Sequence, residues 1–213
     1  MLLAVALVVA YLVGSIPTAY LVGRVKGIDV RKVGSGNMGA TNVYRTLGAG
    51  PAAIVLAIDA AKGVAAALLP RWLGFTNADA WGLLLGVIAM LGHARPIFIG
   101  FKSGGKGVAT AGGIFGALVP AACAVGVAAF LIVLGITRYV SLGSRVAAVT
   151  LAVAVAVTRG VQSVPFLAAL AVAAFVIWSH RSNIARLRRG EERRLGRPGA
   201  QGQSAPGPKG ARP

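Results

Sequence analysis

The chain has 213 residues, 56% of them hydrophobic, and its mean hydropathy of +0.76 makes it more apolar than an ordinary soluble domain. Its 22 Lys and Arg against 5 Asp and Glu give a formal net charge of +17. These charges collect between long apolar runs, which indicates an integral membrane protein and excludes a nucleic-acid partner. The single cysteine, Cys123, excludes an internal disulfide and a multi-cysteine metal site.

The apolar runs predict an all-α integral membrane protein with about seven transmembrane helices. In chain order they cover Leu2–Val22, Pro51–Pro70, Ala80–Gly100, Gly107–Val119, Pro120–Ile136, Leu142–Thr158 and Ser163–Ser179. The stretch from 107 to 136 is too long for one upright span and short for two, and a split at Pro120 distributes the charges better. Seven spans put 18 of the 22 Lys and Arg on one side, which predicts an N-terminus outside and a cytoplasmic C-terminus.

The first polar segment, GSGNMGATNVYRTLG, covers residues 34–48. Its first six letters fit the dinucleotide fingerprint G-x-G-x-x-G, but no buried strand precedes them, so no dinucleotide cofactor is expected. Its small residues let backbone N–H groups face an anion, and its polar side chains can donate to the same anion. A phosphate site is therefore predicted, with a merely flexible glycine loop as the alternative. Its candidate residues are Ser35, Gly36, Asn37, Thr41, Asn42 and Arg45.

The second apolar run contains two charged residues, Asp59 and Lys62, which are three positions apart. This spacing puts them on one helix face, where they can pair. Ionisable residues inside a membrane usually face the bundle interior. We expect a buried ion pair that supports helix packing rather than catalysis.

The second polar segment, GHARPIFIGFKSGGKGVAT, covers residues 92–110 and leads into the next apolar run. It fits G-x-x-x-x-G-K, but Gly107 stands where a P-loop has Ser or Thr, and the loop has no acidic residue, so neither an NTPase nor a metal site is predicted. Amides and ammonium groups at a helix start can still bind phosphate. The candidates are Lys102, Gly104, Gly105, Lys106 and Gly107, while His93 is expected to be structural.

The third polar segment has two parts. Each part contains two residues that are three positions apart and hence lie on one helix face. Ser141 and Ser144 begin the sixth predicted span, and His180 and Asn183 follow the seventh. An amphipathic basic segment comes next, which suits a polar headgroup at the membrane interface. The Pro- and Gly-rich composition beyond it predicts a folded domain over residues 1–192 and a disordered basic tail over 193–213 near membrane lipid.

Five segments in this order resemble the bacterial acyl-phosphate:glycerol-3-phosphate acyltransferases, the PlsY family: GSGNMGATNVYRTLG, DAAKG, GHARPIFIGFKSGGKGVAT, YVSLGS and HRSNIARLRRGEE. The resemblance implies transfer of a fatty acyl group from acyl phosphate to the 1-hydroxyl of sn-glycerol 3-phosphate, with lysophosphatidic acid and inorganic phosphate as products. It also implies seven helices in the bacterial inner membrane, an active site facing the cytoplasm, and no cofactor or metal. By resemblance, the family's phosphate-handling first loop corresponds to Ser35, Thr41 and Arg45, its glycerol-phosphate loop to Lys102, Gly104, Gly105, Lys106 and Gly107, and its polar residues around the substrates to Ser141, His180 and Asn183. We expect catalytic roles for Arg45, Lys106, Ser141, His180 and Asn183, and substrate binding by the other candidates of the three polar segments.

Two departures from the family pattern are visible. Ser103 intervenes in FKSGGKG, and Met38 stands where proline is usual. The first departure leaves open which lysine meets which phosphate, and we expect Lys106 because it remains within GGKG.

Acyl phosphate is already activated, so we expect direct attack by the glycerol hydroxyl without an acyl-enzyme. A substrate phosphate oxygen or His180 could accept the proton. A membrane transporter for organic phosphates is the alternative function, because polar groups within apolar helices can line a permeation path.

Overall fold

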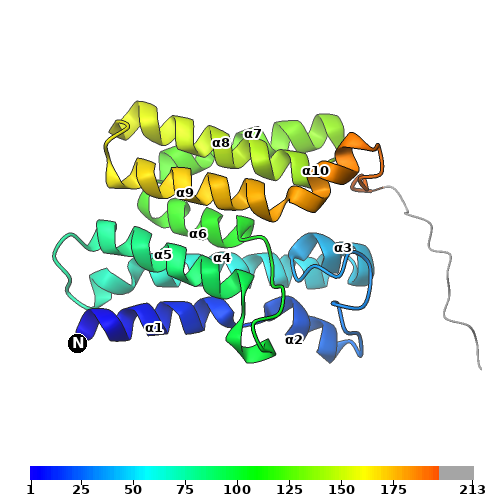
Figure 1. The fold of residues 1–213 in the computed structure, drawn as a ribbon, viewed down its shortest axis with the longest axis horizontal. Helices are drawn as coiled ribbons and strands as arrows, with labels where there is room; N and C mark the ends of the chain where they lie inside the picture. Colours follow the sequence, from blue (N-terminus) through cyan, green and yellow to red (C-terminus); the bar gives the residue numbers. More distant parts are fainter. Residues whose placement is uncertain (197–213) are drawn as a thin grey trace, which may run out of the picture.

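The computed structural model describes residues 1–196, which are folded into α-helices and one short 3₁₀-helix (Figure 1). In chain order they are α1 (Leu2–Ser15), α2 (Thr18–Val25), α3 (Ala40–Leu47), α4 (Ala49–Trp72), α5 (Ala78–Ala94), η1 (Ile97–Ile99), α6 (Val108–Leu118), α7 (Pro120–Thr137), α8 (Val140–Arg159), α9 (Val164–Ser179) and α10 (Arg181–Arg188).

The long helices run roughly side by side in two groups (Figure 1). α1, α4 and α5 form one group, and α7, α8 and α9 form the other. α6 lies between the groups and packs on α4, α5 and α7. The short helices α2, α3 and α10 gather at the end of the bundle opposite the N-terminus, so the polar segments of the sequence meet there.

Proline marks two breaks in the apolar runs. Pro17 separates α1 from α2 inside the first predicted span, because it has no N–H to continue the helix. Pro120 occupies the first turn of α7, where its fixed φ is compatible with a helix start. The predicted split at Pro120 is therefore confirmed as a break between two helices.

Five helices or helix pairs are long and apolar enough to cross a membrane, within the part of the chain that the structure describes. These are Leu2–Val25, Ala49–Trp72, Ala78–Ile99, Pro120–Thr137 and Val140–Arg159, and the bent pair α9 and α10 would be a sixth. The all-helical membrane fold is thus confirmed with five or six candidate crossings. The predicted span Gly107–Val119 corresponds to α6, which has only 11 residues. At 1.5 Å per residue it is about 16 Å long, against about 30 Å for the hydrocarbon core.

α6 ends beside the starts of two neighbouring helices. Leu118 and Val119 line the same cavity as Ala78 of α5 and Val164 of α9. The first residues of α6 therefore lie well inside the bundle rather than at its opposite end.

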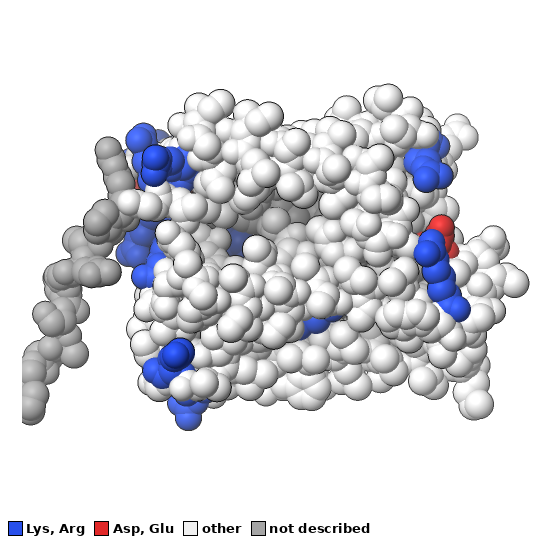
Figure 2. Space-filling model, turned by 180° about the vertical axis from the view of Figure 1, so that it is seen from behind, with Lys and Arg blue, Asp and Glu red and all other residues white. Residues whose placement is uncertain are grey.

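The basic side chains are segregated along the bundle. Figure 2 shows Lys and Arg gathered at the end where the described chain finishes, with a small group at the other end and a largely uncharged surface between them. This arrangement agrees with apolar helices in lipid and basic loops in water.

The predicted ion pair of the second span is present in α4. Lys62 Nζ lies 2.7 Å from Asp59 Oδ1, and both side chains are almost fully buried. Thr18 donates to the same carboxylate oxygen at 3.0 Å. The pair thus ties α4 to the start of α2, as expected for a structural role.

α4 and α6 approach closely through glycine, as is common where helices pack without help from the hydrophobic effect. A Cβ at Gly113 would overlap the carbonyl group of Ala60, whereas a Cβ at the adjacent Gly112 would meet nothing within 4 Å. The two positions therefore form a matched pair on one helix.

We expect Gly113→Ala to destabilise the bundle by about 1–3 kcal/mol, because overpacking forces backbone shifts. For a chain of this size this corresponds to a decrease of roughly 2–12 °C in melting temperature, measured on detergent-purified protein. Gly112→Ala is the control and should unfold at or slightly above the wild-type temperature, since alanine favours helix over glycine. Equal melting temperatures for the two variants would contradict the close packing of α4 on α6.

Candidate active site

Asn42 organises the first polar loop. The side chain is buried, and its Oδ1 accepts hydrogen bonds from Ser35 N at 2.8 Å and Ser35 Oγ at 3.1 Å. Its Nδ2 donates to the carbonyl oxygens of Val30 and Val33 at 3.0 and 3.2 Å. The amide that the sequence suggested for phosphate binding therefore holds the loop in shape. Substrate contact at Asn42 stays a prediction.

The other candidates of this loop lie around Asn42. Gly36 has a φ of +69°, in the left-handed region that favours glycine, and Thr41 lies half-buried in the first turn of α3. Asn37 donates from Nδ2 to the carbonyl oxygen of Gly104 at 3.3 Å. This hydrogen bond joins the first and second polar segments, which are 67 residues apart in the sequence.

The glycine-rich loop folds back onto the end of α5. Gly104 N donates to Ala94 O at 2.9 Å, and Gly105 N donates to His93 O at 3.2 Å. Gly107 then adopts a φ of +77° directly before α6. The predicted helix start after the glycines is confirmed.

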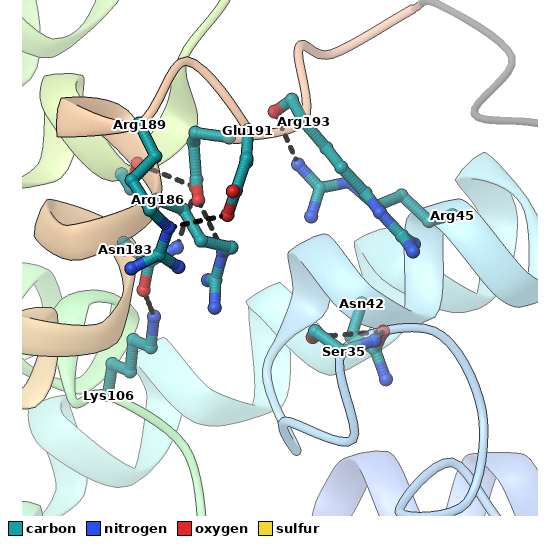
Figure 3. Close-up of polar contacts among 11 residues, drawn as sticks. Ser35, Asn42, Arg45, Lys106, Asn183, Arg186, Arg189, Glu191 and Arg193 are labelled. Carbon is teal, nitrogen blue, oxygen red and sulfur yellow. Dashed lines mark hydrogen bonds and ion pairs between the residues drawn. The ribbon is translucent and has the colours of Figure 1, made fainter.

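The two lysines of the glycine-rich loop have different environments. Lys106 is largely enclosed and donates from Nζ to Asn183 Oδ1, whereas Lys102 is exposed on the loop surface. Figure 3 shows the Lys106 side chain pointing at Asn183. The geometry therefore favours Lys106 over Lys102 as the lysine of a joint site.

Side chains of the third polar segment converge on a carboxylate that was not among the residues predicted from the sequence. Glu192 Oε1 accepts hydrogen bonds from Ser141 Oγ at 2.8 Å and Asn183 Nδ2 at 2.6 Å, and Oε2 accepts one from Arg186 Nε at 2.8 Å. The residue is only 8% exposed. We call Lys106, Ser141, Asn183, Arg186 and Glu192 the Glu192 cluster.

Arg45 joins this end of the molecule from α3. Its guanidinium donates to the carbonyl oxygen of Arg193 at 3.0 Å (Figure 3). Leu195 N donates to Arg138 O at 2.7 Å, so the chain just beyond α10 packs on the body of the protein at least to Leu195. The remainder of the predicted tail, residues 197–213, lies outside the described residues.

Positive charge exceeds negative charge around the Glu192 cluster, within the described part of the chain. Four cations lie near enough to the Glu192 carboxylate to interact with it: Arg45, Lys106, Arg145 and Arg186. Burial opposes ionisation of Glu192, but hydrogen bonds from Asn183, Ser141 and Arg186 outweigh it and hold the pKa of this carboxyl below its usual range. The excess of positive charge suits a phosphate.

Burial and neighbouring charges also shift the pKa values of the basic side chains near Glu192. The pKa of Lys106 is lowered to about 8, mainly by burial; Glu192 opposes this decrease, and the neighbouring arginines contribute to it. Burial also lowers the pKa of the half-buried Arg45, which stays charged at neutral pH because arginine begins from a very high value. An added anion would relieve the repulsion among these cations.

His180 and Ser144 make local hydrogen bonds. His180 Nδ1 lies 2.8 Å from Val176 O, which fixes the proton on Nδ1 and leaves Nε2 as an acceptor. Ser144 Oγ donates to Val140 O at 2.9 Å, within its own helix. His180 is thus in a state that can accept a proton, while Ser144 satisfies the backbone of α8.

A cavity of about 380 Å³ lies beside Lys106. Apolar and cationic side chains share its wall, which includes Leu91, Phe175 and Trp178 together with Arg95, Lys106 and Arg181. Such a wall suits a molecule with an apolar chain and an anionic end. Across residues 1–196, no three His, Cys, Asp or Glu side chains come together as a metal site would require.

Sequence reasoning missed Glu192, Arg145 and Arg186 as parts of this site. Asn183 and Arg186 are three positions apart on α10, so they share one face of that helix. That spacing was a signal for Arg186. The contact of Ser141 with Glu192 spans 51 residues, and no local spacing encodes it.

The comparisons with known proteins agree with this geometry. A family model described as glycerol-3-phosphate acyltransferase matches residues 4–190. Glycerol-3-phosphate acyltransferase from Geobacter sulfurreducens is 48% identical over 189 residues, covering 88% of this chain and 94% of that protein. The Synechococcus elongatus enzyme of the same name is 46% identical over 195 residues, covering 88% and 91%.

Two solved structures share the fold. Both are crystal structures of PlsY, an integral membrane glycerol 3-phosphate acyltransferase, and each covers 92% of this chain and 96% of its own. The glycerol 3-phosphate form has a TM-score of 0.85 at 36% identity, and the lysophosphatidic acid form has a TM-score of 0.82 at 35% identity. The chain therefore belongs to the glycerol-3-phosphate acyltransferase family and is an integral membrane enzyme of that class.

Proposed function

We propose that this enzyme transfers a fatty acyl group from acyl phosphate to the 1-hydroxyl of sn-glycerol 3-phosphate, giving lysophosphatidic acid and inorganic phosphate. The observation that carries the proposal is the excess of cations around Glu192, beside a cavity with an apolar wall. Both substrates are phosphates, and the donor also has a long apolar chain. PlsY crystallises with glycerol 3-phosphate and with lysophosphatidic acid, which supports the same acceptor and product here.

The candidate residues divide by position. The first loop and the glycine-rich loop, which Asn37 joins, would hold the phosphate of glycerol 3-phosphate through backbone N–H groups and Lys106. Arg45, Ser141 and Asn183 would contact the reacting groups. The remaining proposed substrate-binding residues are Ser35, Gly36, Thr41, Asn42, Lys102, Gly104, Gly105, Gly107 and Ser144.

The proposed reaction is a direct transfer. The acceptor hydroxyl oxygen attacks the acyl carbonyl carbon, and the bond from that carbon to the phosphate oxygen breaks. The hydroxyl proton passes to a phosphate oxygen of the substrate or to His180 Nε2, which is free to accept it. Preorganised cations stabilise the charge that develops on the departing phosphate, so the protein need not form an acyl-enzyme.

The proposed topology has seven crossings, with α6 as a short fourth crossing, the N-terminus outside and the site facing the cytoplasm of the bacterial inner membrane. The gathering of Lys and Arg at the end with α3 and α10 supports this orientation. We also propose that residues 1–192 form the catalytic domain and that 193–213 form a basic tail.

The donor is tested by giving detergent-purified enzyme glycerol 3-phosphate with palmitoyl phosphate, palmitoyl-CoA or palmitoyl-acyl carrier protein. We expect lysophosphatidic acid and an equal amount of inorganic phosphate with palmitoyl phosphate alone. Product from either thioester at a comparable rate would refute the donor assignment. Radiolabelled acyl groups should not remain on the protein, and retained label would refute direct transfer.

The lysine assignment is tested with Lys106→Ala and Lys102→Ala. We expect Lys106→Ala to decrease kcat/KM by about 10²–10³-fold, which is typical when a stabilising charged donor is removed. Lys102→Ala is the matched control from the same loop and should lose less than about tenfold, because Lys102 is exposed. Equal losses, with both proteins folded, would contradict the preference for Lys106.

The low pKa of Lys106 predicts a pH dependence. Lys106 is charged below about pH 8 and loses its proton above it, so KM for glycerol 3-phosphate should rise by about tenfold per pH unit at higher pH. Initial rates are corrected for spontaneous hydrolysis of the donor. In Lys106→Arg the cation persists, and KM should stay flat to about pH 9.5. The same rise in both proteins would assign the titration to another group.

A further inference from the structure

His93 lies between the buried ion pair of α4 and the glycine-rich loop. Its side chain is 8% exposed, and Nδ1 is 3.6 Å from Asp59 Oδ1. Its other edge faces Gly105 so closely that a Cβ at Gly105 would overlap Nε2 and Cε1 of the imidazole. The ring therefore fills the space that a side chain at position 105 would need.

The side of His93 that faces α4 is held in place by the protein. Asp59 is fixed by Lys62 at 2.7 Å and by Thr18 at 3.0 Å. Lys62 also donates to the carbonyl oxygen of Ile16, at the break between α1 and α2. Three segments of the chain thus converge on the carboxylate beside the imidazole.

The loop side is constrained as well. Hydrogen bonds from Gly104 and Gly105 attach the loop to the end of α5, and Asn37 holds it from the first loop. Lys106 is the next residue, and its ammonium group reaches Asn183 of α10. Because Lys106 directly follows Gly105, any shift of Gly105 would also displace Lys106.

We propose that His93 is a positioning residue for acyl transfer, which supports Gly105 and so fixes the position of Lys106. Asp59 orients the imidazole, the imidazole packs against Gly105, and the loop presents Lys106 to the substrate phosphate. The inference rests on the proposed role of Lys106. The contact between His93 and Gly105 is steric, since glycine has no side chain, so the volume of residue 93 matters more than its charge.

The sharpest test is a double-mutant cycle with His93→Ala and Gly105→Ala. Gly105→Ala should decrease kcat/KM for glycerol 3-phosphate by about 100-fold, because small displacements at a positioned group cost this much. His93→Ala removes the ring that the new methyl group meets, so the double variant should recover to within about tenfold of His93→Ala alone. Residues in contact show such non-additivity, while distant residues do not. Strictly multiplicative losses would overturn the proposal.

His93→Ala alone should raise KM for glycerol 3-phosphate by about tenfold and leave kcat within about threefold, because the loop is misplaced rather than removed. His93→Gln, which keeps a side chain reaching toward Gly105, should restore most of the affinity. His93→Ala leaves Asp59 paired with Lys62, so it creates no unpaired buried charge, and its melting temperature reports folding separately. A normal KM in folded His93→Ala would overturn the positioning role.

Gly112→Ala serves as the control for adding a methyl group, since a Cβ at Gly112 meets nothing within 4 Å. Its KM should match that of wild type when it is made alone, and that of His93→Ala when it is combined with His93→Ala. The Lys106→Ala measurement distinguishes the two proposals. Near-normal activity there would refute the proposed phosphate site, whereas an inactive Lys106→Ala with multiplicative losses at 93 and 105 would refute the role of His93 alone.

Discussion

A polar group inside a lipid bilayer must find its partner within the protein, because hydrocarbon offers none. In this structure that constraint is met by contacts between segments far apart in the sequence. Asp59 finds Lys62 within α4, but also Thr18 at the start of α2. Outside the apolar helices, the buried carboxylate of Glu192 likewise accepts hydrogen bonds from Ser141 of α8 and Asn183 of α10. Contacts of this kind therefore hold α4 against the start of α2, and the chain beyond α10 against α8.

In and beside the Glu192 cluster, the polar side chains have hydrogen-bond partners, but carboxylates do not balance all of the positive charges. Lys106 has an amide oxygen as its partner, and Arg45 has a backbone carbonyl, so neither cation is neutralised by a carboxylate contact. Such an arrangement is unfavourable for the protein alone and favourable once an anion arrives. Substrate phosphate would then complete an ion-pair network that the side chains leave incomplete. Binding and stabilisation of the departing phosphate would use the same groups.

Local patterns predicted what depends on local physics. Hydropathy identified the apolar helices, three-residue spacing predicted the Asp59–Lys62 pair, and the length of the apolar run together with the placement of charges predicted the break at Pro120. The preference for Lys106 over Lys102 also agrees with their burial. These features follow from a few neighbouring residues, so a single sequence suffices for them.

The carboxylate at the centre of the site could not be predicted in this way. Glu192 reaches Ser141 only because α10 turns from α9 by 55° and the chain then folds back toward α8. Its sequence context, GEE among arginines, is equally typical of an exposed ion pair, and Glu191 does pair at the surface with Arg189. Asn42 illustrates the reverse case, because the residue type suited an anion while the fold uses its amide to shape a loop. In both cases the role of the side chain depends on which way it points in the fold and on whether it is buried.

The shortness of α6 bears on where the proposed substrates would meet. α4 has 24 residues and is about 36 Å long, whereas α6 is less than half that length and ends level with the starts of α5 and α9. The loop carrying Lys106 therefore lies inward from the end of the bundle that holds α3 and α10. Moving a 16-carbon chain from lipid to water would cost roughly 12 kcal/mol at about 0.8 kcal/mol per methylene. If this loop binds the substrate phosphate as proposed, the inward position of α6 would let the water-soluble substrate approach the fatty chain while that chain stays in lipid.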